Sequence, residues 1–188
     1  RANAIDEILK KSSIPYTAFG ALGDILKKYI CATGDTQLSS LPEKAVIICC
    51  GDHGVSEENV SAYPPETTLH MVANYLIYHG AAANSFADFT GSHLSIADLG
   101  INKKINDLPG LIDFHIADGT DNSAKGPAMT REQAVYSIYY GMQLATQLHD
   151  QRGVTVFLPG EMDLQGPVRP IAAPESTFKN RDGSNNVP

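Results

Sequence analysis

An unbroken apolar run at residues 45–50 constrains the fold of this chain more than any other feature. The run reads Ala-Val-Ile-Ile-Cys-Cys, with β-branched side chains at its centre and no polar residue at every second position. A strand with one face in water alternates apolar and polar side chains, whereas a strand buried on both faces does not. The run therefore predicts a central strand in a sheet that is covered on both sides.

Helical and strand-like segments alternate along the rest of the chain. Apolar residues recur at helical spacing near residues 21–30, 67–77, 81–89 and 130–148, and further strand-like runs occupy residues 93–98, 112–117 and 154–158. Strands separated by helices favour right-handed crossovers between parallel strands. We therefore predict an α/β protein with a parallel, Rossmann-like sheet, helices on both faces, and an edge strand at 112–117.

Two of these helices have a predicted buried stripe. The helix that opens near Pro64 should bury Leu69, Val72, Ala73, Leu76 and Ile77, and the last helix should bury Ala134, Ile138, Met142, Leu144, Ala145 and Leu148. Thr130 precedes the last helix and Gln133 follows three residues later, which is the pattern of a capping box. This helix is expected to begin immediately after Thr130.

Charge and composition exclude several classes of partner. The formal net charge is −7 and lysine and arginine form no dense cluster, so the chain lacks the basic face that binds a nucleic-acid backbone. The apolar stretches are too short to cross a bilayer and the amino-terminal segment has no signal-peptide core. Three cysteines, two of them adjacent in the buried run, indicate a reducing compartment. We expect a cytoplasmic protein that binds neither nucleic acid nor membrane.

The domain organisation follows from the same patterns. Residues 1–164 are predicted to form one domain. Residues 165–188 are rich in proline and glycine and have no apolar period, so we expect an irregular tail. Because the first residue is Arg1 and not methionine, a fragment or a processed form is expected.

Polar residues follow the ends of two predicted strands. Asp52 and His53 come after the run at 45–50, and Glu161 follows the run at 154–158. Ligands bind to open parallel sheets where the carboxyl ends of the strands meet, so these side chains should converge at one rim. Asp52 and His53 could orient a substrate, or Asp52 could cap a turn while His53 binds a loop carbonyl. Glu161 could take part in catalysis or in a structural ion pair.

A metal site is not expected at this rim. No third side chain follows Asp52 and His53 at a spacing typical of known metal sites. The remaining histidines share no spacing and are predicted to be surface or helix-end residues; they are His70, His79, His93, His115 and His149.

Four segments occur in a characteristic order. They read GDHGVSEENVSAYPPETTLHMVANYLIYHGAAANSFA from residue 51, IADLGI from residue 96, GTDNSAKGPAMTREQAVYSIYYGMQLA from residue 119 and LPGEM from residue 158. In order and spacing they resemble the nicotinate-nucleotide:dimethylbenzimidazole phosphoribosyltransferase family, and GALG at 20–23 is similar to its amino-terminal Pro-Gly-Ser-Leu-Gly signature. The resemblance covers residues 18–162, about the first half of the family pattern.

The resemblance implies an activity. It is transfer of ribose phosphate from nicotinate mononucleotide to a benzimidazole-type base, giving an α-ribazole phosphate for cobamide assembly, with no metal and no cofactor. It implies a catalytic role for Glu161 and substrate-binding roles for Asp52, His53, Ser61, Tyr63, Met71 and Met162. A core role for Met71 stays open, because methionine commonly fills gaps in cores. Family members usually form homodimers, so a homodimer is expected.

The sequence also departs from the family. The family continues Gly-Glu-Met into a Gly-Ile-Gly-Asn-Thr turn that suits phosphate, whereas residues 163–168 read DLQGPV. The family's general base is a glutamate further downstream than this chain extends, so the carboxyl-terminal part of the family fold is expected to be missing. The chain alone should therefore transfer phosphoribose slowly or not at all. The alternative function is a non-catalytic heterocycle- or nucleotide-binding module, or a half-enzyme that needs a partner.

Overall fold

The structure is a computed structural model. It describes residues 7, 10, 16–35, 41–61, 63, 64 and 66–162. The chain divides into two compact units, residues 1–41 and residues 42–188. The predicted tail at 165–188 lies outside the described residues, and the predicted domain over 1–164 stays a prediction.

The first unit contains a short 3-10 helix, η1 (Tyr16–Phe19), and the helix α2 (Ala21–Thr33). Ile30 is buried in a small cluster with Leu26 and Tyr29. The helix ends at Gly34, whose left-handed backbone suits glycine and whose N–H donates to the carbonyl of Ile30. This unit matches the helix predicted over residues 21–30.

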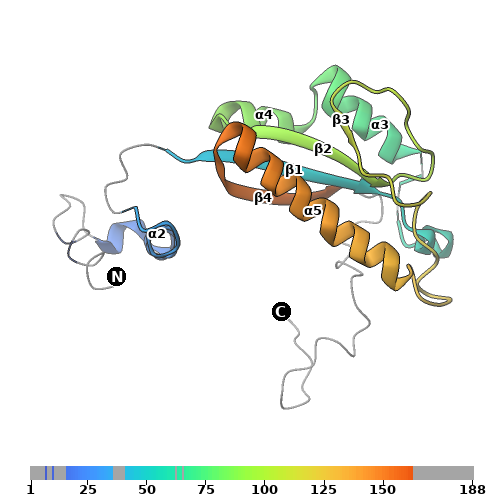
Figure 1. Cartoon of the computed structure of the whole chain (residues 1–188), viewed down its shortest axis with the longest axis horizontal. Helices are drawn as coiled ribbons and strands as arrows, with labels where there is room; N and C mark the ends of the chain where they lie inside the picture. The colour runs from blue at the N-terminus through green and yellow to red at the C-terminus, as the bar shows by residue number, and fades with distance from the viewer. Residues whose placement is uncertain are drawn as a thin grey trace, which may run out of the picture. The chain divides into compact units, whose positions relative to one another are not determined.

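The second unit contains a parallel four-stranded sheet (Figure 1). Its strands are β1 (Glu43–Gly51), β2 (His93–Gly100), β3 (Leu111–Asp113) and β4 (Val154–Met162), in the spatial order β3-β2-β1-β4. All three pairings are parallel. The prediction of one parallel sheet with the apolar run 45–50 at its centre is confirmed.

Two predicted strand boundaries are wrong. The edge strand predicted over 112–117 ends at Asp113; beyond it the N–H groups of Phe114 and Ile116 donate to the carbonyls of Asp98 and Leu99 outside the regular ladder. β4 continues through Pro159 to Met162, beyond the predicted end of the strand at residue 158. Proline is tolerated there because β4 is an edge strand with a partner on one side only.

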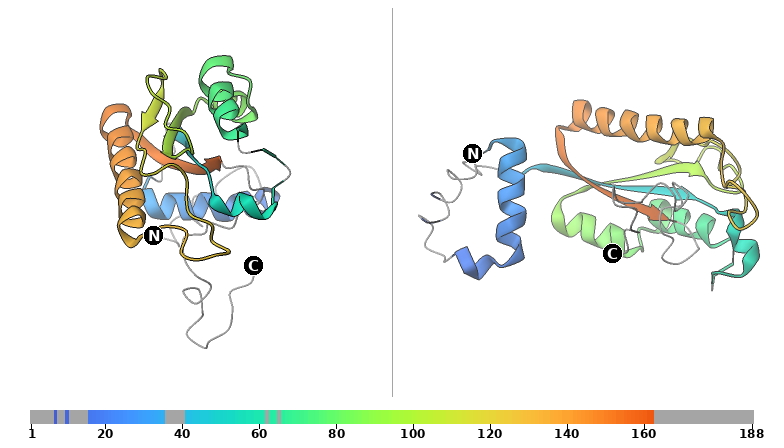
Figure 2. Two further views of the ribbon diagram at one scale, coloured as in Figure 1. Left: turned by 90° about the vertical axis from the view of Figure 1, so that its right-hand side faces the viewer. Right: turned by 90° about the horizontal axis from the view of Figure 1, so that it is seen from below.

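Helices cover both faces of the sheet (Figure 2). On one face lie α3 (Thr67–Ala73), the π-helical turn η3 (Asn74–Tyr78) and α4 (Ala82–Thr90). The other face is covered by α5 (Arg131–Arg152), which begins with the predicted capping box: Thr130 Oγ1 accepts from the N–H of Gln133, and Gln133 Oε1 accepts from the N–H of Thr130. The predicted helices on both faces are confirmed.

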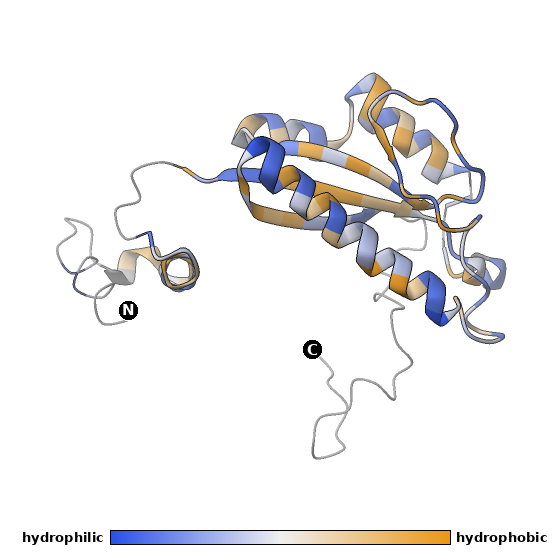
Figure 3. Cartoon of the chain, in the orientation of Figure 1, coloured by the Kyte–Doolittle hydropathy of each residue, from blue (hydrophilic) through white to orange (hydrophobic). Residues whose placement is uncertain are grey.

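Each face has its own apolar core, and the strands between them are largely hydrophobic in their central parts (Figure 3). The core on the α3 and α4 face consists of Ile48, Cys50, Val72, Tyr75, Ala81, Ile96 and Ile101. The core on the α5 face consists of Ala45, Ala97, Leu144, Leu148 and Val154. Alternate residues of β1 enter opposite cores, as the two-residue period of a strand requires.

The predicted helix stripes are partly wrong. Ile77 is 60% exposed, because the π-helical turn changes the phase of the helix and brings Tyr75 inward instead. Leu69, which lies in α3 before that turn, is also exposed. On α5, Ile138 and Met142 are exposed, and the buried residues are Leu144 and Leu148 near its carboxyl end. Only the last turns of α5 therefore bury large side chains against the sheet.

Candidate active site at the carboxyl ends of the strands

The carboxyl ends of β1 and β4 lie side by side. Cys49 and Cys50 of β1 pair in register with Glu161 and Met162 of β4. Asp52 follows Cys50 by two residues, so Asp52 and Glu161 belong to the ends of neighbouring strands. Parallel pairing brings both strand ends to the same rim of the sheet. The predicted convergence of Asp52 and Glu161 is confirmed in this geometry.

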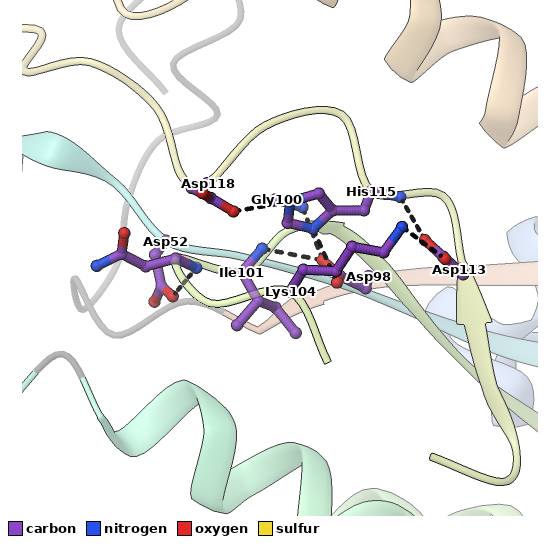
Figure 4. Close-up of polar contacts among 9 residues, drawn as sticks. Asp52, Asp98, Gly100, Ile101, Lys104, Asp113, His115 and Asp118 are labelled. Atoms are coloured by element: carbon purple, nitrogen blue, oxygen red, sulfur yellow. Dashed lines mark hydrogen bonds and ion pairs between the residues drawn. The ribbon is translucent and has the colours of Figure 1, made fainter. Parts of the chain in front are cut away.

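Asp52 joins three parts of the rim. Its Oδ1 accepts a short hydrogen bond from the hydroxyl of Thr68 in α3, and its Oδ2 accepts from the N–H of Asn102 at 2.7 Å (Figure 4). Its own N–H donates to the carbonyl of Gly100. The carboxylate thus fixes α3 and the loop after β2 to the end of β1. The turn-capping role and the substrate-binding role both stay predictions.

His53 and Gly54 pair with the loop that follows β3. His53 forms an isolated parallel bridge with Thr120, whose hydroxyl lies 3.4 Å from His53 Nδ1. The N–H of Gly54 donates to the carbonyl of Thr120 at 3.0 Å. A Cβ on Gly54 would lie 2.6 Å from that carbonyl oxygen. The second glycine of GDHG is therefore required so that the two loops can approach each other.

A second set of contacts holds the same two loops together. Lys125 Nζ lies 2.8 Å from Glu57 in the 3-10 helix η2 (Gly54–Glu58), and Asn122 donates to both Glu57 and Glu58. Hydrogen bonds from Lys125 and Asn122 keep the pKa of Glu57 below its ordinary value. The segments GDHG and GTDN, which are distant in sequence, thus form one layer at the rim.

A buried histidine lies beside this layer. The side chain of His115 is only 9% exposed; its Nδ1 is 3.0 Å from Asp98 Oδ2, and its Nε2 is 3.0 Å from Asp118 Oδ1. Asp98 is itself buried, and its Oδ1 accepts from the N–H groups of Gly100 and Ile101 (Figure 4). The prediction that His115 is a surface or helix-end residue is wrong. Asp98 is a carboxylate near the end of a predicted strand, as Asp52 is after the run at 45–50. That position was the sequence signal that could have indicated a role for Asp98 and for its partner His115.

Two methionines predicted to contact the base lie on the α3 face. Met71 and Met162 both pack against the core on that face, and the hydroxyl of Tyr75 donates to Met162 Sδ at 3.6 Å. Burial, followed by the nearby Cys50, raises the pKa of Tyr75, so the phenol stays protonated as this donor. Met71 from α3 and Met162 from β4 thus pack against the same core.

Ser61 and Tyr63 form a separate pair before α3. Ser61 Oγ accepts from the N–H of Tyr63 at 3.1 Å, and the side chain of Tyr63 is 64% exposed. Glu161 is also exposed. Tyr63 is therefore accessible, and its assignment to the base pocket stays a prediction, as does that of Ser61.

Among residues 16–35, 41–61 and 66–162 and the other described positions, no group of three or more His, Cys, Asp or Glu side chains could hold a metal ion. Within the same part of the chain, no helix is long and apolar enough to cross a membrane.

Comparison with known proteins decides the family. A family model described as phosphoribosyltransferase matches residues 1–166. The nicotinate-nucleotide–dimethylbenzimidazole phosphoribosyltransferase of Geotalea uraniireducens is 39% identical over 165 residues, which cover 88% of this chain and 46% of the relative. The protein of the same name from Geobacter sulfurreducens is 36% identical over 170 residues, which cover 90% of this chain and 47% of the relative. This chain belongs to the phosphoribosyltransferase family of these proteins.

The fold of the phosphoribosyltransferase family agrees with the described sheet. The crystal structure of nicotinate-nucleotide–dimethylbenzimidazole phosphoribosyltransferase from Thermus thermophilus superimposes with a TM-score of 0.79 at 32% identity, over 87% of this chain and 48% of that chain. The resemblance found in the sequence motifs is thus confirmed. The chain spans about half the length of the phosphoribosyltransferases that it matches.

Proposed function

We propose that the protein transfers the ribose phosphate of nicotinate mononucleotide to a benzimidazole-type base, giving an α-ribazole phosphate for cobamide assembly. The observation that carries the proposal is the rim, where Met71 and Met162 pack against the core of the α3 and α4 face and Glu161 directly precedes Met162 at the end of β4. A flat heterocycle needs apolar contacts, and a reaction at its nitrogen needs a carboxylate nearby. The relatives carry an enzyme's name, which favours transfer over the non-catalytic alternative.

In the proposed reaction, a ring nitrogen of the base attacks the anomeric carbon of the ribose. The bond from that carbon to nicotinate breaks, the electron pair leaves with nicotinate, and the base passes its N–H proton to solvent water. Glu161 stabilises the positive charge that develops on the ribose and the attacking ring. Asp52 and His53 act on the substrate indirectly, because their contacts hold α3 and the loops of the rim in place.

Ser61 and Tyr63 complete the proposed base site. They immediately precede the turn into α3, which carries Met71, and Tyr63 offers an accessible aromatic ring that could stack on a bound base. We propose residues 1–164 as the catalytic unit.

We further infer a homodimer that acts in the cytoplasm. Several large apolar side chains of α5 are exposed, among them Val135, Ile138 and Met142, and a second copy could cover them. The three cysteines are unpaired, which fits a reducing compartment.

Base binding tests the proposed site directly. In a calorimetric titration with 5,6-dimethylbenzimidazole, Met71→Lys should weaken binding by about tenfold or more, because a charge would lie on the apolar surface. Leu69→Lys is the matched control, since Leu69 is an exposed residue of the same helix, and its affinity should stay within about twofold. Equal affinity in the parent and Met71→Lys rules out this base site.

Turnover tests the chemistry separately. The purified chain is mixed with nicotinate mononucleotide and dimethylbenzimidazole, and α-ribazole phosphate is followed by chromatography. We expect turnover far below the ~10 s⁻¹ typical of enzymes, and a further loss in Glu161→Gln. Turnover near the typical value would show that the chain supplies a general base and a phosphate site of its own.

A further inference from the structure

The buried histidine at the rim has a carboxylate at each of its two ring nitrogens. His115 Nδ1 lies 3.0 Å from Asp98 Oδ2, and His115 Nε2 lies 3.0 Å from Asp118 Oδ1 (Figure 4). An ionised carboxylate only accepts hydrogen bonds, whereas a neutral imidazole donates through one nitrogen and accepts through the other. Both contacts are therefore hydrogen bonds only when the ring carries two protons and a positive charge.

The two carboxylates differ in their access to water. The side chain of Asp98 is 2% exposed, whereas that of Asp118 is 70% exposed. A buried carboxylate that loses a donor is not compensated by water, but an exposed one is. When the ring has a single proton, that proton therefore stays on Nδ1, which faces Asp98, and the hydrogen bond to Asp118 is lost.

Two further charged side chains near the ring, Asp113 and Lys104, pair with each other at 2.9 Å. The backbone N–H of His115 donates to Asp113 Oδ1 at 3.1 Å, a contact that does not involve the ring. Neighbouring elements add two titratable groups, which are Tyr140 of α5 near Lys104 and Cys50 of β1 near Asp98. The second proton of the ring therefore depends chiefly on Asp98 and Asp118.

The ring connects the loop at 114–120 with the end of β2. The N–H of Thr120 donates to the carbonyl of Asp52, and the carbonyl of Thr120 accepts from the N–H of Gly54. Asp118 lies two residues before Thr120. The hydrogen bond from the ring to Asp118 thus ties the part of the loop that pairs with GDHG to the buried carboxylate of β2.

The same loop forms one wall of a cavity at the rim. The cavity has a volume of about 170 Å³, and Ile116 and Gly119 of the loop line it together with Gln133 and Ser137 of α5. A shift of the loop near Asp118 would therefore change this wall as well as the pairing with GDHG.

We propose that His115 is a positioning residue of the rim, and that it holds the loop at 114–120 in place only while its ring carries both protons. As the pH rises and the ring loses one proton, Nε2 presents a lone pair to Asp118 and the two repel each other. The loop should thus be fixed at acidic pH and looser at alkaline pH. The effect on phosphoribosyl transfer rests on the proposed function, whereas the state of the ring and of the loop does not.

The ring nitrogens test the protonation state directly. In ¹⁵N–¹H NMR spectra of the full chain labelled at histidine, with the ring assigned through the amide of His115, both nitrogens should be protonated at pH 6. After the loss of one proton at higher pH, Nδ1 should stay protonated and Nε2 should not. An unprotonated nitrogen at pH 6, or a proton that stays on Nε2 after the loss, overturns the proposal.

Hydrogen exchange tests the effect on the loop. As the ring loses its proton, the protection factors of the N–H groups of Gly119 and Thr120 should fall by about tenfold or more, the loss expected for one charge-assisted hydrogen bond. Ile48 in the central strand should keep its protection, because the loop opens locally. Loop protection that does not change with pH overturns the proposal.

A pair of aspartate variants provides the matched comparison. In Asp118→Ala, the N–H groups of Gly119 and Thr120 should show low protection at both acidic and alkaline pH. Asp150→Ala removes the same charge from an exposed position of α5 and should retain the pH dependence of the parent. Full pH dependence in Asp118→Ala would show that the ring does not act through this carboxylate.

Transfer rates separate this inference from the proposed function. The ratio of kcat/KM in Asp150→Ala to that in Asp118→Ala should be about tenfold at pH 6 and should approach one at alkaline pH, since other titrations of the reaction are common to both variants. A ratio that does not vary with pH would overturn the positioning role of His115. Absence of transfer in the parent and both variants rejects the proposed function, and the ring and exchange measurements then decide this inference.

Discussion

On the α3 and α4 face of the sheet, helices pack large apolar side chains along the strands and also bury the polar residues Thr68, Asn84 and Asp98. On the α5 face, a longer helix buries only Leu144 and Leu148, both near its carboxyl end. Its first turns place Gln133 and Ser137 opposite glycines at the strand ends, and a cavity results. One face is thus closed and tied by hydrogen bonds, and the other is partly open at the rim.

The difference shows how one sheet can combine stability with a site. The closed face supplies fixed strand ends through Asp52 and Thr68, while the open face has small residues where large ones would fill the space. If this comparison is right, substitutions of the same type should have different effects on the two faces.

The largest effect is expected for Asp98→Ala. Removing this buried carboxylate leaves the N–H groups of Gly100 and Ile101 and the ring of His115 without their acceptor. Breaking a buried pair in this way typically costs about 3–5 kcal/mol of unfolding free energy, to be measured by urea denaturation. Asp118→Ala is the control, because that side chain is 70% exposed, and it should change stability little. Equal effects would show that Asp98 does not tie the closed face.

Alanine substitutions of two isoleucines on neighbouring strands test the difference between the two faces directly. Ile96 on β2 is fully buried in the core of the α3 and α4 face, and Ile47 on β1 is half-buried on the α5 face. Ile96→Ala should cost about 3–5 kcal/mol and Ile47→Ala less than about 2 kcal/mol, since the second site is less tightly enclosed. Equal losses in denaturant melts would mean that the α5 face is packed as tightly as its counterpart.

The reactivity of two adjacent cysteines on β1 is a further measure of how closed each face is. Burial, followed by nearby Cys49, Asp98 and Asp52, raises the pKa of Cys50 to about 12, and burial also raises the pKa of Cys49. At pH 8 only about 10⁻⁴ of Cys50 would be thiolate, the reactive form. Mass spectrometry after iodoacetamide treatment of the native chain should find exposed Cys31 labelled first, Cys49 next and Cys50 last. Labelling of Cys50 before Cys49 would contradict a closed α3 and α4 face.

The smallest effect should come from an exposed carboxylate at the edge of the sheet. A hydrogen bond from Lys104, and then one from the N–H of His115, keep the pKa of Asp113 below its ordinary value. A carboxyl with a lowered pKa in the folded state stabilises that state above its unfolded pKa of about 3.9, and this contribution is lost as pH falls through the folded pKa. Asp113→Asn should therefore be slightly less stable than the parent at neutral pH and equal to it in acid. If Asp113→Asn lost more unfolding free energy than Asp98→Ala, the exposed contact would contribute more to stability than the buried one, which contradicts the comparison.

The strands and helices could be predicted from the sequence because periodicity reports burial directly. The run at 45–50 and the capping box at Thr130 both matched the structure. The buried stripes could not be predicted fully, since the π-helical turn at Asn74–Tyr78 changes which residues face inward. His115 was missed because its partner Asp98 is distant in sequence and becomes a neighbour only when β2 and β3 pair.

The motifs located the rim but not its internal contacts. GDHG predicted where a site lies, yet the pairing of Gly54 with Thr120 depends on a tertiary approach that no local pattern encodes. The cavity was also missed, because its lining comes from the ends of β1 and β2, the segment between β3 and α5, and α5 itself. Such a space has no sequence signal of its own.

Gln133 has two roles at once. Its side chain and its N–H close the capping box with Thr130, and the same residue lines the cavity. A substitution that reshapes the cavity at this position would also fray the first turn of α5. The shape of the cavity therefore changes with less loss of stability through Ser137 or Met129, which also line it, so among relatives we expect differences in the cavity to accumulate at those two positions while Gln133 is retained.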